Sequence, residues 1–380
     1  MSSKRIAFIY MQMELTTVPC IMSFLNRIAQ SGYEVDLFTF KSEKNKPKIP
    51  NVKIYSFSGY YGKNVFLALF TLISAVIQII LYMFRRKTSY QYIVGVHLFG
   101  LFVAAFVGLI FRIPIIYYNL EMYFSKELKN VLWKACKQLE ICCTKRCTWF
   151  ITLDKWHARL LSKEHGFPLS RFLILPNTAI GAARKQRSNL LHEMYGIENN
   201  KKIILTMGSR FYSFRNYHEI LKSIESFPDD YILVVHLGDI PHEIEEQYRS
   251  NPKLIIADKF ISYDELDNLY SSAYVGLVLY QNDDRPAGGR NQTYMGLSSG
   301  QFNFFMKCGI PCITTAQPTF KWIFSNFKCG AILSSFQDIS ATLKIIEDQY
   351  GEYSNGAIKC YEDWLDFDKH FDVFISAVKN

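Results

Sequence analysis

Short apolar, β-branched segments alternate with helix-like segments along nearly all of the 380 residues. Residues 5–10 have the pattern of a buried strand, residues 18–30 have helical periodicity, and residues 34–40 alternate like a second strand. A strand, a helix and a strand within about 35 residues form a β-α-β unit, which joins two parallel strands. Because the alternation continues, the sequence predicts an α/β fold with doubly wound parallel sheets.

The alternation is interrupted between residues 179 and 200, where strand character is lost and charged residues accumulate. Beyond this point the pattern of strands and helices starts again. We therefore expect a Rossmann-like domain over 1–178, an interdomain linker over 179–200 and a second Rossmann-like domain over 201–365. The remaining segment, 366–380, reads as a helix that returns to the first domain. A chain of 380 residues is long enough for two such domains.

The charge balance and the cysteines restrict the partners. Lys and Arg number 43 against 34 Asp and Glu, a net charge of +9, which favours an anionic partner such as nucleotide phosphates or anionic lipid. We expect no nucleic-acid partner, because the sequence has no finger spacing, aromatic-basic RNA motif or basic-region heptad. The nine cysteines lack paired metal-ligand spacing, so we expect buried, reduced thiols and no metal site. The N-terminus lacks the apolar core and cleavage site of a signal peptide, and reduced thiols are typical of a cytoplasmic protein.

Residues 65–84 form an uncharged apolar segment with basic residues on both sides. Its length of about 20 residues is enough to span a bilayer. A span here would put the strands before and after it on opposite sides of the membrane, where they could not share a sheet. We therefore expect the helices within about 64–111 to lie in the membrane interface, with lysines and arginines of 126–146 at anionic headgroups. The protein would be peripheral or monotopic, on the cytoplasmic side of the cell membrane; a buried crossover helix is the alternative.

Two places in the second domain have the composition of an anion site. Ligands of open α/β sheets bind beyond the carboxyl ends of strands, and helix N-termini attract anions. Each of the two segments follows a predicted strand, and each alone could also be an ordinary turn or helix cap. The candidate donor-binding residues are Gly208, Ser209, Arg210 and Arg215 in the first segment, and Ser298, Ser299 and Gly300 in the second.

Residues 299–313, with the sequence SGQFNFFMKCGIPCI, resemble the S-G-K-x-x-E-Y-M-A-x-G-x-P-V-I segment of GT-B glycosyltransferases of the group 1 or family 4 type. The segments 173–178, 203–208, 234–238 and 264–273 agree with the same family. The resemblance implies a GT-B fold, in which two Rossmann-like domains face a central cleft. It also implies a hexosyltransferase-like enzyme that binds the nucleotide-sugar donor in its C-terminal domain and the acceptor in its N-terminal domain. The nucleotide sugar is then a co-substrate, and no cofactor or metal is required.

The chain departs from this family at two glutamates, whose positions hold Gly296 and Phe304. Recognition of the ribose must then come from another group, for which Asn303 is the candidate. A retaining outcome is not implied either, and an inverting reaction needs a base on the acceptor side. Three residues that follow predicted strands of the first domain are the candidates for this catalytic base: Glu121, Glu14 and His97.

The sequence thus predicts transfer of a sugar from a nucleotide sugar to a saccharide acceptor, which we expect to be lipid-linked. The reaction would belong to the assembly of a cell-surface polysaccharide or glycolipid. Two other functions stay open at this point. One is a non-catalytic sugar-binding partner of an active transferase, suggested by the missing glutamates, and the other is a nucleotide-sugar epimerase on the same fold.

Overall fold

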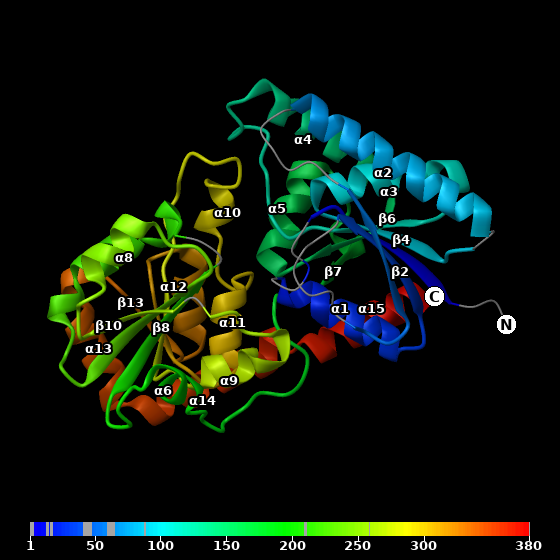
Figure 1. The fold of residues 1–380 in the computed structure, drawn as a ribbon. Coiled ribbons are helices and arrows are strands. Elements are labelled where there is room, and N and C mark those ends of the chain that lie inside the picture. The colour runs from blue at the N-terminus through cyan, green and yellow to red at the C-terminus, as the bar shows by residue number, and fades with distance from the viewer. Residues whose placement is uncertain are drawn as a thin grey trace. The chain divides into compact units, whose positions relative to one another are not determined.

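The computed structural model describes residues 4–12, 15, 18–40, 48–58, 65–86, 89–208, 211–257 and 259–379. The chain divides into two compact units (Figure 1). Unit 1 comprises Met1–Leu175 and Lys369–Asn380, and unit 2 comprises Pro176–Asp368. Each unit contains one parallel sheet with helices packed on it.

The sheet of unit 1 has the strand order β3-β2-β1-β4-β5-β6-β7 within the described residues. Every pair of neighbouring strands is parallel. The strands are mostly short, apolar and buried, as strands covered on both faces must be. They are β1 (Arg5–Tyr10), β2 (Glu34–Phe40), β3 (Val52–Phe57), β4 (Tyr92–Val96), β5 (Ile115–Tyr118), β6 (Cys147–Thr152) and β7 (Phe172–Ile174).

Helices cover both faces of this sheet, with α1 and α15 on one face and α2 and α3 on the other (Figure 1). Phe24 of α1 contacts Phe8 of β1 and Phe374 of α15, both with ring centroids 5.3 Å away. The C-terminal helix is therefore part of the core of unit 1. The helices are α1 (Pro19–Gln30), α2 (Val65–Arg86), α3 (His97–Phe111), α4 (Val131–Thr144), α5 (Lys155–His165) and α15 (Phe367–Lys379).

Helix α2 lies between β3 and β4 in the sequence, and its apolar segment Leu69–Arg86 has the length and hydropathy of a membrane span. Strand β1, which precedes α2, pairs in parallel with β4, which follows it, from Ile6 opposite Tyr92 to Tyr10 opposite Val96. Both sides of α2 therefore belong to one sheet. In this fold, α2 does not cross a bilayer.

The sheet of unit 2 has the order β10-β9-β8-β11-β12-β13 within the described residues, and all its pairs are parallel. Its strands are β8 (Lys202–Gly208), β9 (Tyr231–Leu237), β10 (Leu254–Ala257), β11 (Val275–Val278), β12 (Cys312–Thr314) and β13 (Gly330–Ile332). The helices around it are α6 (Leu190–Tyr195), α7 (Tyr217–Lys222), α8 (His242–Tyr248), α9 (Leu266–Ser271), α10 (Arg290–Thr293), α11 (Gly300–Lys307), α12 (Pro318–Asn326), α13 (Ile339–Asp348) and α14 (Tyr350–Cys360).

The core of unit 2 consists of two apolar clusters, one including residues of α9, α11 and α14 and the other including residues of α7 and α13. Helix α11 packs directly on β11, where a Cβ atom at Gly276 would lie only 2.4 Å from the Phe305 ring. Glycine at this position lets the helix approach the strand closely. This packing places the first turn of α11 near the end of β11.

The segment 179–200, which we expected to be a linker, lies within unit 2. It contains α6, and Leu191 of that helix is fully buried. Two of its charged residues bond to α9 and the residues after it: Arg184 Nη1 donates to Asn268 Oδ1 at 2.6 Å, and Arg187 Nη1 donates to the Ala273 carbonyl at 2.8 Å. Arg184 and Arg187, which contribute to the linker-like composition of this segment, therefore attach it to unit 2.

Candidate functional site

The order of strands reverses once in each sheet, next to its first strand. In unit 2 the reversal lies between β8 and β11, and in unit 1 it lies between β1 and β4. At such a switch point the connections leave to opposite faces, which opens a crevice beyond the carboxyl ends of the strands where ligands bind. The predicted site residues should therefore lie at these two edges.

The carboxyl end of β8 carries the first predicted donor segment. Gly208 is the last residue of β8 and pairs with Leu237 of β9. Ser209 and Arg210 lie outside the described residues. Arg215 ends a short 3₁₀ helix, η3 (Ser213–Arg215), and is half-buried.

Aromatic rings hold the guanidinium group of Arg215. It lies over the ring of Tyr280, 4.4 Å from the centroid, and over the ring of Phe214 at 5.4 Å. Its Nη1 donates a hydrogen bond to Gln301 Oε1 at 3.0 Å, in the first turn of α11. Burial is the largest influence on the pKa of Arg215 and lowers it, but the surrounding tyrosines, Tyr280 first, raise the pKa overall. Arg215 is thus a fixed positive charge.

No described residue of unit 2 neutralises the charge of Arg215. No described carboxylate pairs with it, and its buried Nε atom has no hydrogen-bond acceptor among the described residues. Arg285 differs, because its Nε donates to Asp283 Oδ2 at 2.6 Å while its guanidinium covers Phe214 at 3.8 Å. Of these two arginines, Arg215 has the unused capacity to bind an anion.

The second predicted segment forms the start of α11. Ser299 is the N-cap: its Oγ accepts from the Phe302 amide at 3.3 Å and shares a hydrogen bond with the Tyr280 hydroxyl at 2.8 Å. Ser298 is buried, and its hydroxyl contacts the Met295 sulfur. A Cβ atom at Gly300 would lie 2.8 Å from Asn177 Nδ2, so this position has little room for a side chain. Because both serine hydroxyls are engaged, the backbone amides of the first turn other than that of Phe302 are the groups available to an anion.

Asn303 does not have the surface that ribose binding requires. Its exposed fraction is 0%, and its Nδ2 donates to the carbonyls of Leu297 at 2.8 Å and Asn177 at 3.3 Å. The side chain therefore ties α11 to two neighbouring turns. The expectation that Asn303 replaces the family's ribose-binding glutamate receives no support from this geometry.

The two family glutamate positions are also closed to a carboxylate. A Cβ atom at Gly296 would lie 2.7 Å from the Thr319 side chain. Phe304 is 1% exposed and stacks on Tyr270 with centroids 4.9 Å apart. A charged side chain at either position would need room or solvent that the core does not provide.

In unit 1, the carboxyl edges of β4 and β5 carry His97 and Glu121. His97 directly follows β4, begins α3 and has a φ of +55°, which is uncommon for a residue other than glycine. Burial lowers the pKa of His97 and the charge of Glu121 opposes this shift, so the two side chains are close enough to interact. Glu121 is exposed and accepts a hydrogen bond from the Tyr123 hydroxyl at 2.8 Å. The third candidate base, Glu14, lies outside the described residues.

Three residues of the unit 2 edge were not predicted from the sequence: Phe214, Tyr280 and Gln301. Tyr280 follows β11 and contacts both predicted segments, since its ring lies under Arg215 and its hydroxyl bonds Ser299. An aromatic residue after a strand at the switch point is the signal that could have identified it. Gln301 occupies the lysine position of the family segment, and its amide also donates to the Leu277 carbonyl of β11 at 3.1 Å.

Comparison of the sequence with protein-family models and with curated proteins found no match. Solved structures are similar in fold. HepE from Anabaena, in complex with UDP and glucose, is 11% identical with a TM-score of 0.71 over 99% of both chains. WaaG, a glycosyltransferase involved in lipopolysaccharide biosynthesis, is 14% identical with a TM-score of 0.65 over 95% of this chain and 96% of WaaG. A putative UDP-N-acetylglucosamine 2-epimerase from Listeria monocytogenes is 10% identical with a TM-score of 0.63 over 98% of this chain and 95% of its own.

These identities are low, so the similarity concerns the fold. Two parallel sheets with flanking helices, matched over nearly the whole chain, define the GT-B fold. The prediction of a GT-B fold from residues 299–313 and the strand-helix alternation is confirmed.

Proposed function

We propose that the chain is a glycosyltransferase that transfers a sugar from a nucleotide-sugar donor to a saccharide acceptor. The observation that carries the proposal is Arg215, a cation at the switch point of unit 2 that no described carboxylate neutralises, beside the first amides of α11. A diphosphate is the ligand that such a combination of guanidinium and helix N-terminus favours. The solved complexes of HepE with UDP and with UDP-glucose support a nucleotide sugar as the donor.

The donor groups act on the leaving group. As the bond between the anomeric carbon and the diphosphate breaks, the electron pair stays on the diphosphate, which gains negative charge. Arg215 and the first amides of α11 bind the diphosphate more strongly as that charge grows, which lowers the barrier. Gly208 leaves the end of β8 without a side chain, so the ligand can approach the backbone.

The acceptor requires a base, and we propose Glu121 for this role. The acceptor hydroxyl oxygen attacks the anomeric carbon opposite the leaving diphosphate, which inverts the anomeric configuration. The hydroxyl proton passes to the Glu121 carboxylate. The charge of Glu121 acts on His97, but burial lowers the pKa of His97 overall, so His97 stays neutral at neutral pH. A neutral His97 leaves the charge of Glu121 available for the proton.

We further propose that the acceptor is lipid-linked and that the enzyme acts at the cytoplasmic side of the cell membrane, in the assembly of a surface polysaccharide or glycolipid. The support is the apolar outer surface of α2 and α3, whose largest side chains are exposed. Such exposure is rare on a monomeric soluble protein.

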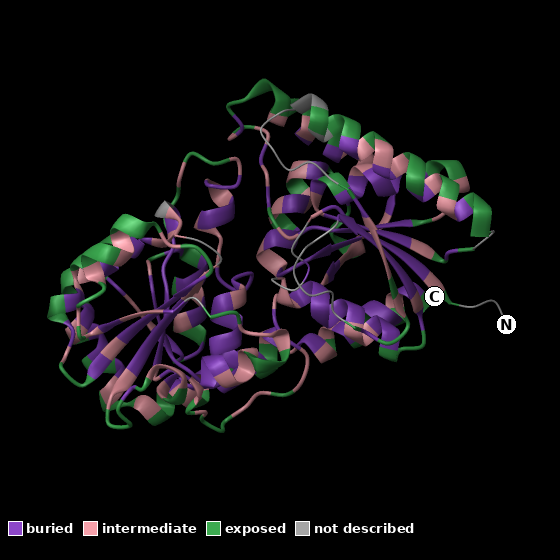
Figure 2. Ribbon diagram, viewed as in Figure 1, coloured by how far each residue is buried: buried purple, intermediate pink, exposed green. Residues whose placement is uncertain are grey.

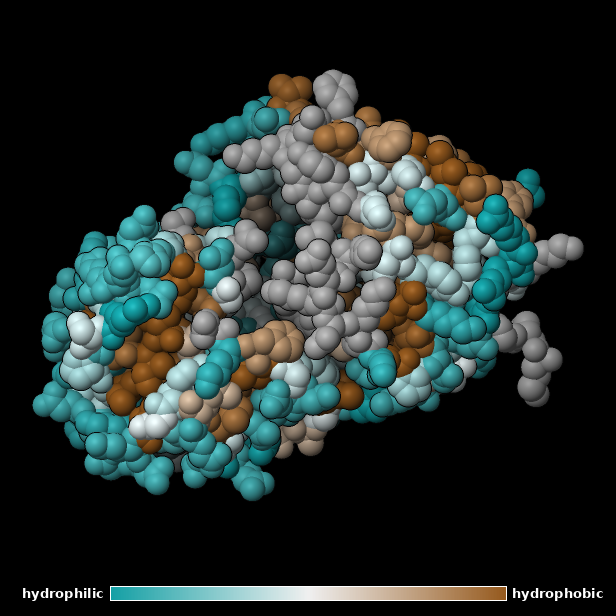
Figure 3. Space-filling view, viewed as in Figure 1, coloured by the Kyte–Doolittle hydropathy of each residue, from teal (hydrophilic) through white to brown (hydrophobic). Residues whose placement is uncertain are grey.

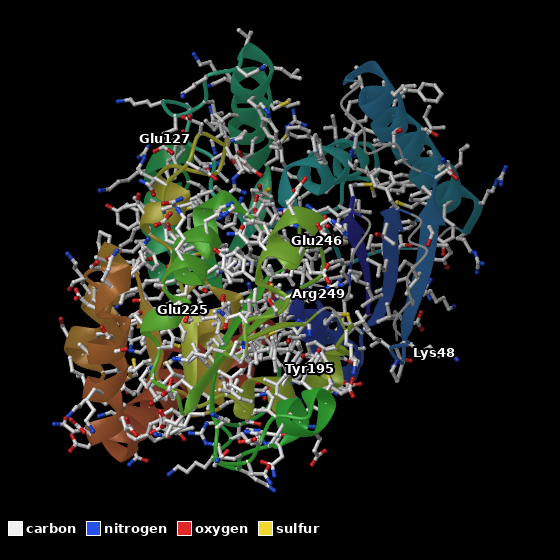
Figure 4. All side chains as sticks on the ribbon, turned by 60° about the vertical axis from the view of Figure 1, so that its left-hand side comes forward. Lys48, Glu127, Tyr195, Glu225, Glu246 and Arg249 are labelled. Carbon is white, nitrogen blue, oxygen red and sulfur yellow. The ribbon has the colours of Figure 1, made fainter. Side chains whose placement is uncertain are left out.

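The test is UDP binding, measured by calorimetry, together with UDP release from UDP-sugars in the presence of a lipid extract. Arg215→Ala should weaken UDP binding by about 10- to 100-fold, because charge-assisted hydrogen bonds contribute roughly 1.5–3 kcal/mol. The matched control is Arg249→Ala in the same unit. Arg249 follows α8, pairs with Glu245 at 2.9 Å and is 69% exposed (Figure 4), so its loss should leave UDP affinity unchanged.

Three outcomes would refute the proposal. Equal UDP affinity in Arg215→Ala and the parent would move the donor site elsewhere. UDP binding without acceptor-dependent UDP release would indicate a sugar-binding partner. Conversion of the UDP-sugar without any acceptor would indicate an epimerase, the activity ascribed to the Listeria neighbour.

A further inference from the structure

Large apolar side chains are exposed on the outer side of α2, α3 and α4 in unit 1, a surface that we call the apolar face. They include Phe70, Phe84, Phe106, Leu109, Val131 and Leu132, with exposed fractions from 46% to 80%. Figure 2 shows exposed and intermediate residues along most of α2, above strands that are buried, and Figure 3 shows hydrophobic atoms along this helix. The described residues do not cover this surface.

The apolar face is continuous across neighbouring helices. Phe84 near the end of α2 contacts Phe111 at the end of α3, with ring centroids 4.9 Å apart. Helix α3 in turn packs against α4. A contiguous patch of this kind marks an interaction site, whereas scattered exposed apolar residues do not.

The inner side of α2 is firmly attached to the sheet. Ala75, Ile79 and Met83 are buried, and the Tyr82 hydroxyl bonds to Tyr55 at 2.6 Å and to Asp36 at 3.3 Å. The helix therefore belongs to unit 1, and only its outer side is available to a partner. A partner can then contact only the outer side of α2, over the length of the helix.

Exposed cations accompany the apolar face. They are Arg85 and Arg86 at the end of α2, Arg112 after α3, Lys126 before α4, Lys134 on α4 and Arg146 after it. The prediction that the lysines of 126–146 form a basic surface is wrong for Lys137. This residue is 2% exposed, and its Nζ donates to Glu140 Oε2 at 2.8 Å. The basic character of the surface comes from the other positions.

The charges decide between two possible occupants. A second copy of the chain, meeting this face about a two-fold axis, would bring the same cations near one another and raise the energy of the contact. An anionic bilayer offers hydrocarbon to the phenylalanines and leucines and negative headgroups to the arginines and lysines. The bilayer is complementary to both components of the surface.

We propose that the apolar face docks on an anionic lipid bilayer, with α2 and α3 lying along the membrane interface. The proposal rests on the proposed function, because docking would bring the enzyme to the bilayer in which a lipid-linked acceptor lies. Helix α3 connects the candidate base edge with the apolar face. It begins at His97, and along its length it exposes Phe99, Phe106, Leu109 and Ile110. Its fifteen residues extend over roughly 20 Å at 1.5 Å per residue, so the candidate base edge lies within one helix length of the lipid.

The experiment is flotation of the full chain with vesicles of phosphatidylcholine alone and of phosphatidylcholine with phosphatidylglycerol. We expect binding to the anionic vesicles that weakens as salt is raised. The double substitution Phe70→Gln and Phe106→Gln should reduce binding at least 10-fold. The control, Phe260→Gln with Val373→Gln, changes side chains that are 63% and 62% exposed but lie off the apolar face, so it should bind like the parent.

Two results would overturn the proposal. One is absence of binding to anionic vesicles, and the other is equal binding by the two double variants. Light scattering on the same proteins without vesicles tests whether a second copy covers the apolar face. A dimer that dissociates only in Phe70→Gln with Phe106→Gln would assign the face to self-association. UDP binding separates this proposal from the previous one: docking fails alone if the chain binds UDP but not vesicles, and the donor site fails alone in the reverse case.

Discussion

The two units share one topology but differ in what their surfaces present. In unit 2, α8 is acidic and has no buried residue, and its exposed side chains are mainly charged. In unit 1, α2 is also a crossover helix between two strands, yet most of its exposed side chains are leucine, isoleucine and phenylalanine. The parallel sheet thus determines where helices lie, while the side chains on their outer sides determine what each unit can contact.

The switch-point edges differ in the same way. The edge of unit 2 presents an unpaired arginine and helix amides, which suit an anion. The edge of unit 1 presents Glu121 and His97, which suit proton transfer. A shared strand order therefore gives each sheet one switch-point edge, and only the residues at each edge distinguish the proposed donor site from the proposed base.

The largest effect should come from Glu121, the proposed base of unit 1. Glu121→Gln keeps the shape of the side chain and removes its basicity, so turnover should fall by about 10²- to 10⁴-fold while UDP affinity is unchanged. Glu127→Gln is the control from the same loop (Figure 4). Full turnover in Glu121→Gln, or a product of retained configuration, would remove the functional contrast between the units.

A pair of phenylalanines tests the contrast in burial. Phe304→Ala in the core of unit 2 should reduce the free energy of unfolding of that unit by about 3–5 kcal/mol. Phe106→Ala in α3 of unit 1, where the ring is 60% exposed, should change unfolding of its unit by less than about 0.5 kcal/mol. Denaturant unfolding, followed separately for each unit, measures both values. Similar losses would show that Phe106 is covered in solution.

Acid should destabilise unit 1 through His165. Burial, aided by the charge of Lys137, holds the pKa of His165 well below its usual value. Since the unfolded chain then binds a proton that the folded chain does not, stability should fall as pH drops below about 6.5, by roughly 1.4 kcal/mol per pH unit. His165→Gln should make the slope of unfolding free energy against pH shallower. An unchanged slope would locate the acid sensitivity elsewhere.

The smallest effect concerns the attachment of α2. Tyr82→Phe removes the hydroxyl that bonds to Tyr55 and Asp36 and leaves the ring packed on Phe38. The free energy of unfolding of unit 1 should fall by about 0.5–1.5 kcal/mol, with vesicle binding unchanged. A loss of vesicle binding instead would mean that Tyr82 belongs to the outer side of the helix.

Periodicity was sufficient to predict the doubly wound parallel sheets, because buried strands and amphipathic helices have different patterns, while the GT-B fold was implied by the resemblance at residues 299–313. The sequence indicated candidate site residues only where a local motif coincides with a strand end, as at Gly208, Arg215 and Ser299, and their role in binding stays a prediction. Partners distant in sequence could not be predicted. Tyr280 reaches Arg215 only across the sheet, and Asn303 is buried by the turn at Asn177.

Charge gave the least reliable information. Lys137 lies in a basic segment, but the fold encloses it between Glu140 and His165, with its Nζ 2.7 Å from His165 Nε2. The charged residues of 179–200 likewise bond within unit 2. A sequence shows how many charges a segment has, whereas their partners are set by tertiary contacts.

The position of α2 between β3 and β4 has a consequence for synthesis of the chain. When α2 leaves the ribosome, β4 and α3 have not yet emerged, and the roughly 25 residues up to the end of α3 need about 1–5 s more to follow it. During that interval an apolar helix is exposed without its neighbour. The partners of Tyr82, on β2 and β3, precede it in the chain and are already present. The hydrogen bonds of Tyr82 can therefore hold the nascent helix on its own sheet, before a membrane or another apolar chain captures it.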